Sequence, residues 1–107
     1  MRVGRRAVYF SVIGLLDAPL PLPSEVVQAV RRAKRKLAIL DLSQTDMHQP
    51  KSLEWLEQLA ALADAEGVRL RVVAPSGTKL RRALELLRFT RFIVVRDTVK
   101  SAVRYAV

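Results

Sequence analysis

The sequence contains no cysteine and only one histidine, His48. The absence of cysteine excludes disulfide bonds, thiolate nucleophiles and zinc sites built on cysteine. A single histidine among scattered carboxylates is a poor set of metal ligands, and closeness in sequence is no argument for a Ser-His-Asp triad. We therefore expect no catalytic residue, no metal and no cofactor, and we expect that the protein is not an enzyme.

Glycine and proline are also scarce, with 4 and 5 residues among 107, whereas half of the residues are hydrophobic. This composition and length are typical of one globular domain, residues 1–107. No apolar run reaches the length of a membrane span. The basic head followed by Ala7 to Leu16 is similar to a short signal peptide, but Asp17 follows at once and no small-residue cleavage site precedes the prolines. We therefore expect a cytoplasmic protein.

Acidic residues are too few to balance the basic ones, since 10 Asp and Glu face 19 Lys and Arg, for a net charge of +9. Such an excess of positive charge indicates affinity for polyanions. The basic residues are spread along the whole chain, however, and a genome rich in arginine codons would give the same balance. Nucleic acid therefore stays open as a partner, with net charge alone as its support.

Four segments read as strands, because they are rich in β-branched or aromatic residues or alternate between apolar and polar. Apolar residues at helical spacing follow each of them and predict four helices. Helical crossovers favour parallel pairing with right-handed connections. We predict an α/β domain in the order β-α-β-α-β-α-β-α, with a mainly parallel or mixed four-stranded sheet and about four helices. The predicted strands are Ala7–Ile13, Leu37–Leu42, Val68–Val73 and Phe92–Val95, and the helices begin at Ser24, Pro50, Thr78 and Asp97 or Thr98.

The ends of the predicted helices carry local signals. Ser24 can cap the first helix, and the cations within Arg31–Lys36 crowd its last turn, where they suit the helix dipole. The third helix is predicted over Thr78–Arg88, with Leu87 on its inner face. Just before it, Ser76-Gly77-Thr78-Lys79 lacks the full spacing of a phosphate-binding loop, so we reject that interpretation.

The chain is organised around Leu37–Leu53. An apolar run predicts a buried strand, a polar loop is predicted over Asp41–Gln49, and Pro50 then opens a helix, since its fixed φ suits the first helical position. A polar loop that leads onto a helix N-terminus is a natural place for a site, because the free N–H groups and the dipole favour negative charge. The alternative interpretation is an ordinary connection between a strand and a helix.

Four motifs occur in order along the chain, at a spacing that belongs to a known family. They are Gly14-Leu15-Leu16-Asp17, Leu40-Asp41-Leu42-Ser43, Glu66-Gly67-Val68-Arg69-Leu70, and Phe92-Ile93-Val94-Val95 with Asp97-Thr98 after it. Together they resemble STAS domains, the class that includes anti-sigma-factor antagonists, over nearly the whole chain. The head, Met1–Arg6, leaves little room for the extra N-terminal strand of many relatives.

The resemblance implies a mixed sheet with helices packed on it and no intrinsic enzymatic activity. In regulatory relatives, a kinase phosphorylates a Ser or Thr within an Asp-Ser-Ser/Thr-Gly segment at the start of this helix. Counting back from Leu53 without a gap places that segment on Gln49–Ser52. Pro50 then replaces the phosphoacceptor, and the other three residues also depart from the family pattern. We expect that the usual phosphorylation switch is absent.

These observations predict a regulatory protein–protein interaction module. The resemblance implies that its partner is an anti-sigma factor, a kinase-like regulator or a STAS scaffold partner. Two alternatives stay open, a STAS-like accessory subunit of a membrane transporter and a basic nucleic-acid-binding domain. The predicted partner-binding loop consists of Asp46, Met47, His48, Gln49, Pro50, Lys51 and Ser52.

Overall fold

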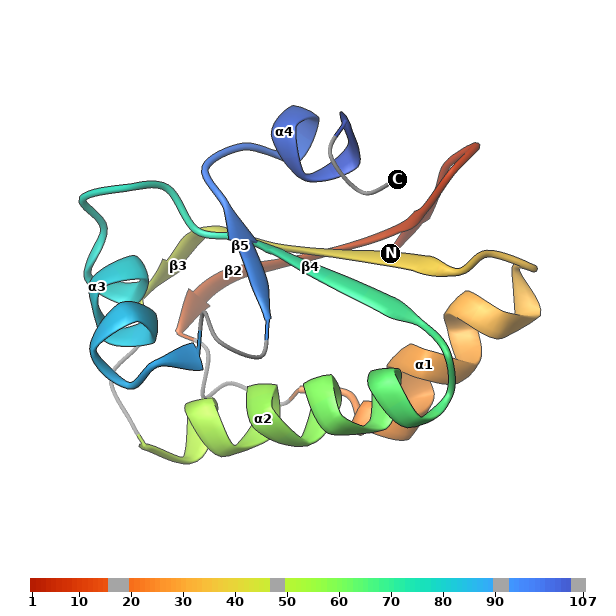
Figure 1. The fold of residues 1–107 in the computed structure, drawn as a ribbon, viewed down its shortest axis with the longest axis horizontal. Coiled ribbons are helices and arrows are strands. Elements are labelled where there is room, and N and C mark those ends of the chain that lie inside the picture. The colour runs from red at the N-terminus through yellow and green to blue at the C-terminus, as the bar shows by residue number, and fades with distance from the viewer. Residues whose placement is uncertain (16–19, 47–49, 90–92, 105–107) are drawn as a thin grey trace.

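The computed structural model describes residues 1–15, 20–46, 50–89 and 93–104, and of residues 13–15, 46, 50–52 and 104 it describes the backbone alone. Within these ranges the chain forms strands and helices in the predicted alternation, with one further strand at the start (Figure 1). The elements are β1 (Arg2–Val3), β2 (Val8–Leu15), α1 (Pro23–Arg32), β3 (Leu37–Asp46), α2 (Pro50–Ala65), β4 (Arg69–Val73), α3 (Lys79–Leu86), β5 (Val94–Arg96) and α4 (Val99–Arg104).

The strands form one mixed sheet in the order β1-β2-β3-β4-β5. Strands β2 to β5 are parallel, and β1 is antiparallel to β2. The α/β prediction is confirmed, and the parallel core follows from the helical crossovers. The head does hold a strand, against our expectation, because a tight turn in which the Gly4 amide donates to the Ala7 carbonyl (2.8 Å) returns the chain onto β2.

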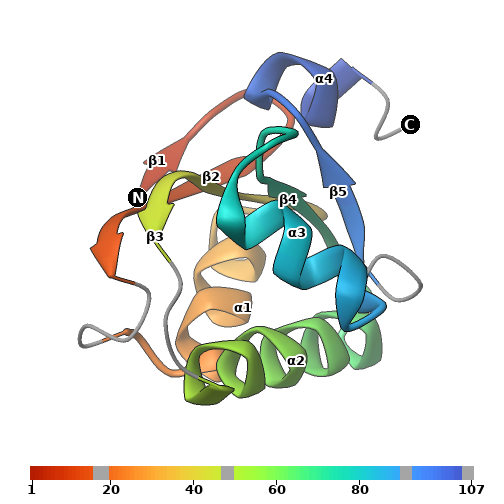
Figure 2. The ribbon, with the colours of Figure 1, turned by 90° about the vertical axis from the view of Figure 1, so that its left-hand side faces the viewer.

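The helices cover the two faces of the sheet unequally (Figures 1 and 2). Side chains of α1, α2 and α3 pack with alternate residues of β2, β3 and β4 in the larger core, which includes Leu40 and Leu56. The opposite face carries α4 and a smaller core around Ile39 and Ala102. This division follows from the two-residue period of a strand, which sends neighbouring side chains to opposite faces. No helix within the described ranges is long and apolar enough to cross a membrane.

The predicted polar loop Asp41–Gln49 is wrong over residues 41–46, because β3 continues to Asp46. The register between β2 and β3 shifts after the pair Ser11 and Asp41, with one extra residue on β3, and parallel pairing resumes at Ile13 with Gln44. The buried hydroxyl of Thr45 donates to the Val12 carbonyl at 2.6 Å. Polar residues therefore extend the strand, since their backbone and hydroxyl groups find partners on β2.

The ends of α1 also differ from the prediction. The helix begins at Pro23 rather than after Ser24, its N-cap is Leu22, and the Glu25 carboxylate accepts the Leu22 N–H at 3.2 Å. It ends at Arg32, because Lys34 adopts a left-handed φ of 58°. The remaining cations of the predicted last turn therefore lie on the connection to β3.

Helix α2 begins at Pro50, as predicted from the local rule for proline. Leu56 and Leu59 on its inner face are at most 1% exposed. The indole nitrogen of half-buried Trp55 donates to the Pro21 carbonyl at 2.8 Å. This bond ties α2 to the segment before α1 and fixes where the start of α2 lies against the sheet.

Candidate protein-interaction surface

The predicted partner-binding loop, residues 46–52, joins the end of β3 to the start of α2. Asp46 is the last residue of β3, and Pro50, Lys51 and Ser52 form the first turn of α2. Met47, His48 and Gln49 lie outside the described residues, as do the side chains of the other four. The structure thus gives the backbone position of the loop ends and places Pro50 at the first helical position.

The outer face of α2 is acidic in an otherwise basic protein. Glu54, Glu57, Asp64 and the following Glu66 are exposed, and no Lys or Arg lies between residues 52 and 66. Glu66 pairs with Arg31 at 2.6 Å, whereas the other three form no ion pair with a described residue. The exposed face of α2, which follows residues 46–52, therefore carries negative charge, whereas the chain as a whole is positive.

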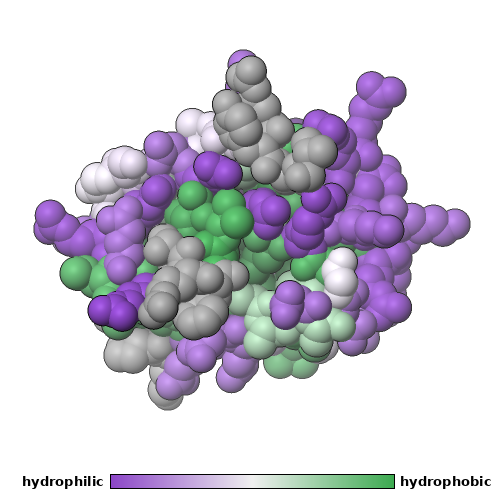
Figure 3. Space-filling model, in the orientation of Figure 1, coloured by the Kyte–Doolittle hydropathy of each residue, from purple (hydrophilic) through white to green (hydrophobic). Residues whose placement is uncertain are grey.

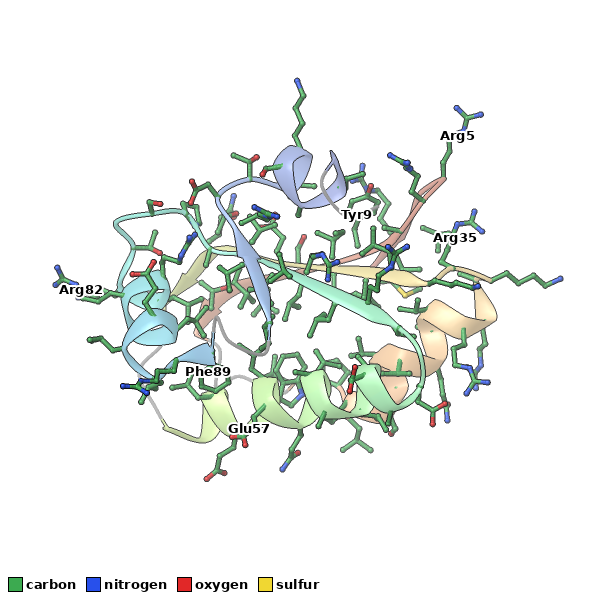
Figure 4. The ribbon with its side chains drawn as sticks, viewed as in Figure 1. Arg5, Tyr9, Arg35, Glu57, Arg82 and Phe89 are labelled. Atoms are coloured by element: carbon green, nitrogen blue, oxygen red, sulfur yellow. The ribbon has the colours of Figure 1, made fainter. Side chains whose placement is uncertain are left out.

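A groove of about 480 Å³ runs beside this acidic face, between α2 and the connection from α3 to β5. In Figure 4, Glu57 on α2 and Phe89 on the connection lie close to each other at this groove. Leu87, which is 55% exposed, supplies apolar surface to it. The groove is lined by Glu57, Ala60, Ala61, Asp64, Leu87, Phe89 and Ile93.

Helical periodicity in the sequence does not predict this groove, because it places Leu87 on the buried face of the third helix. Leu80 and Leu84 are buried as predicted, but α3 ends at Leu86, and Arg88 then takes a left-handed φ of 60°. Leu87 lies outside the helix and turns toward solvent. A helix pattern over Thr78–Arg88 carries no signal for this early end, since neither Leu87 nor Arg88 is a usual stop residue.

The rejected phosphate-loop resemblance lies at the turn between β4 and α3. There Asp97 supplies the anion itself: its carboxylate accepts hydrogen bonds from the Ser76 hydroxyl (2.8 Å), the Ser76 amide (3.2 Å) and Arg81 Nη1 (2.9 Å). The Thr78 hydroxyl accepts the Arg81 amide at 3.2 Å and so caps α3. The bonds from Ser76, followed by the charge of Arg81, hold the pKa of the Asp97 carboxyl below its usual value. This turn is therefore satisfied by the protein's own groups.

The last connection, between β5 and α4, supplies a helix cap. Of the two residues that the sequence offers as the cap of the last helix, Asp97 and Thr98, it is Thr98 that caps α4, because its hydroxyl accepts the Ser101 amide (3.0 Å). Within the described ranges, no three His, Asp or Glu side chains lie close enough together to hold a metal ion. The surface of α2 and its groove remains the most distinctive feature.

Comparisons with known proteins give a match in structure but none in sequence. No family model matches the chain, and no curated protein sequence matches it. The solved structure of the anti-sigma factor antagonist SpoIIAA in its unphosphorylated form matches with a TM-score of 0.67 at 14% identity, covering 94% of this chain and 88% of SpoIIAA. The chain therefore has a STAS-like fold, in agreement with the resemblance drawn from its motifs.

Proposed function

We propose that the protein is a non-enzymatic STAS-like module that regulates another protein by binding it in the cytoplasm. Support comes from the similarity of fold to an anti-sigma factor antagonist over 94% of the chain. The partner expected on this basis is an anti-sigma factor, a kinase-like regulator or a STAS scaffold partner. This similarity of fold is the observation that carries the proposal, and the residue at the start of α2 bears on how the module would be controlled.

Pro50 is the first residue of α2, and the gapless count from Leu53 puts it where regulatory STAS proteins carry the phosphoacceptor. Proline has no hydroxyl group, so it cannot accept a phosphate. A phosphate at a helix start adds nearly two negative charges and can repel a partner without unfolding the domain. We infer that this protein lacks that switch and binds its partner either constitutively or under a different control.

The proposed docking surface is the start segment of α2, residues 46–52, together with the groove beside α2. The segment offers polar groups at a helix N-terminus, and the groove offers exposed apolar side chains between Glu57 and Asp64. Apolar area surrounded by polar groups is the usual composition of a protein interface. The two parts lie along one helix, so a single partner can contact both.

The variant Lys51→Glu tests this surface. In the first turn of α2 the substitution should change the free energy of unfolding by no more than about 0.5 kcal/mol, because an anion is tolerated at a helix N-terminus. A reversed charge in an interface should weaken binding at least about tenfold, through unpaired or repelling groups. The partner is first captured from native-cell extract on immobilised wild-type protein, identified and purified, and its affinity is then measured by calorimetry.

The matched control is Lys100→Glu, the same charge reversal on α4 at the opposite face of the sheet. It should leave the affinity unchanged. Equal affinities for wild type and Lys51→Glu, with both proteins folded, would remove the start segment from the docking surface.

A further inference from the structure

Positive charge gathers at one end of the molecule, which we name the basic end and define as Arg5, Arg6, Lys34, Arg35, Lys36 and Arg69. These residues come from the turn between β1 and β2, the connection between α1 and β3, and the start of β4. In Figure 4, Arg5 and Arg35 lie at the opposite end of the molecule from Phe89, and Figure 3 shows that this side is strongly hydrophilic.

Specific contacts hold the three segments of the basic end together. The guanidinium of Arg35 donates to the Gly4 carbonyl through Nε (3.0 Å) and to the Ala33 carbonyl through Nη1 (2.9 Å). The Arg69 amide donates to the Lys36 carbonyl at 2.8 Å. This bond lies at the start of the pairing between β3 and β4, where Leu37 is the register partner of Arg69. The segments that carry the cations are therefore held together at one end of the sheet, although Arg5 and Arg69 lie 64 positions apart in the sequence.

Four cations of the basic end are not neutralised within the described part of the protein. Arg5, Arg6, Lys34 and Lys36 are exposed and form no ion pair with a described carboxylate. Unpaired cations on a surface raise the local concentration of anions. An external anion is therefore the natural counterpart of this end.

Next to the basic end, β4 adds a second arginine that faces α4. Arg71 is half-buried, and its Nε is enclosed and has no hydrogen-bond partner among the described residues. Burial, and then the charges of Arg69 and Arg96, lower the pKa of Arg71. Arg71 therefore adds positive potential beside the basic end, in a place that is partly shielded from water.

We propose that the basic end binds the phosphate backbone of nucleic acid, independently of base sequence. Three neighbouring strands, about 4.8 Å apart, present the cations over about 10 Å, and duplex DNA carries one charge per roughly 1.7 Å of axis. Several phosphates can thus meet several cations at once. Arg5 and Arg6 are exposed, and the planar fork of an arginine matches a phosphate in two-point contact. The cations stand on turns and strand ends rather than on an amphipathic helix that would lie in a lipid interface.

The test is fluorescence anisotropy with labelled 20-nucleotide single-stranded and duplex DNA, titrated at 50 to 300 mM salt. Wild-type protein should bind both, and log K should fall linearly with log salt. The variant Arg5→Glu/Arg6→Glu/Lys36→Glu should bind at least about 30-fold more weakly at 50 mM salt, with a salt slope shallower by about 2 on single strands, since each phosphate contact contributes about 0.7.

The matched control is Lys79→Glu/Arg82→Glu/Lys100→Glu, which removes the same charge from exposed positions on α3 and α4. It should lose less than threefold in affinity, and both triple variants should keep the thermal unfolding of a folded protein. Equal losses in the two variants would assign binding to net charge and overturn the proposal. Failure of wild type to bind DNA at 50 mM salt would also overturn the proposal. A parallel sedimentation assay with vesicles containing 30% phosphatidylserine tests the lipid alternative, and binding to the vesicles without binding to DNA would overturn the proposal as well.

Discussion

Asp97 accepts two hydrogen bonds from Ser76, one from the hydroxyl at 2.8 Å and one from the backbone amide at 3.2 Å. Arg81 adds a third bond to the same oxygen at 2.9 Å. The carboxylate thereby joins the residue after β5 to the turn before α3. A loop that resembles an anion site in sequence is thus occupied by an anion of the protein itself.

This arrangement predicts a pH dependence of stability. Because the pKa of Asp97 is lowered in the folded state, the unfolded state binds more protons once the pH falls toward the ordinary aspartate value of about 3.9. The contribution is complete above that value and is lost as the pH falls through the lower, folded pKa. Thermal unfolding from pH 6 to pH 2 should show wild type more stable than Asp97→Asn at pH 6, with the difference shrinking in acid. A difference that stays constant over this range would argue against the bonds from Ser76 and Arg81.

The larger core should depend on Leu56, which faces the sheet from α2 and is 0% exposed. Leu56→Ala should lower the free energy of unfolding by about 2–5 kcal/mol, because it removes buried methyl groups and leaves a cavity. Leu86→Ala is the control, since Leu86 is 74% exposed, and it should change stability by at most about 0.5 kcal/mol. Urea denaturation measures both, and a loss below about 1 kcal/mol for Leu56→Ala would contradict the packing described.

The proposed loss of the usual switch predicts the outcome of a phosphorylation assay. Incubation with ATP and a kinase of the type that modifies STAS regulators should leave the start of α2 unmodified, since Pro50 offers no hydroxyl. Mass spectrometry of the intact protein and of its peptides reads the result. Stoichiometric phosphate on Ser52 would show that the gapless count is wrong and that a shifted switch survives.

Local rules and hydrophobic periodicity were sufficient for most of the fold. Pro50 starts α2 as its restricted φ predicts, and Leu80 and Leu84 are buried at helical spacing. The extension of β3 was missed because polar residues predict a loop, whereas Thr45 is held in the strand by a bond to Val12, 33 positions earlier. Pairing across the sheet decides such cases, and periodicity within one segment does not contain that information.

The two proposed binding surfaces could be predicted only in part. The start of α2 was predicted, because a proline after a polar run marks a helix start. The groove depends on where α3 ends, and Leu87 becomes exposed only through the left-handed φ of Arg88. The basic end depends on the turn at Gly4, which brings Arg5 and Arg6 beside cations that lie near residue 35. Net charge was visible in the sequence, but its position was not.

Docking of another protein along α2 can be detected in the native cell by photo-crosslinking. One variant carries a photo-reactive amino acid at Ala61, which lines the groove, and a second carries it at Lys100 on α4, with both variants checked for unchanged thermal unfolding. After irradiation, we expect a discrete crosslinked protein from position 61 and none from position 100. Crosslinks of equal yield at both positions, or a crosslink from position 100 alone, would contradict docking along α2.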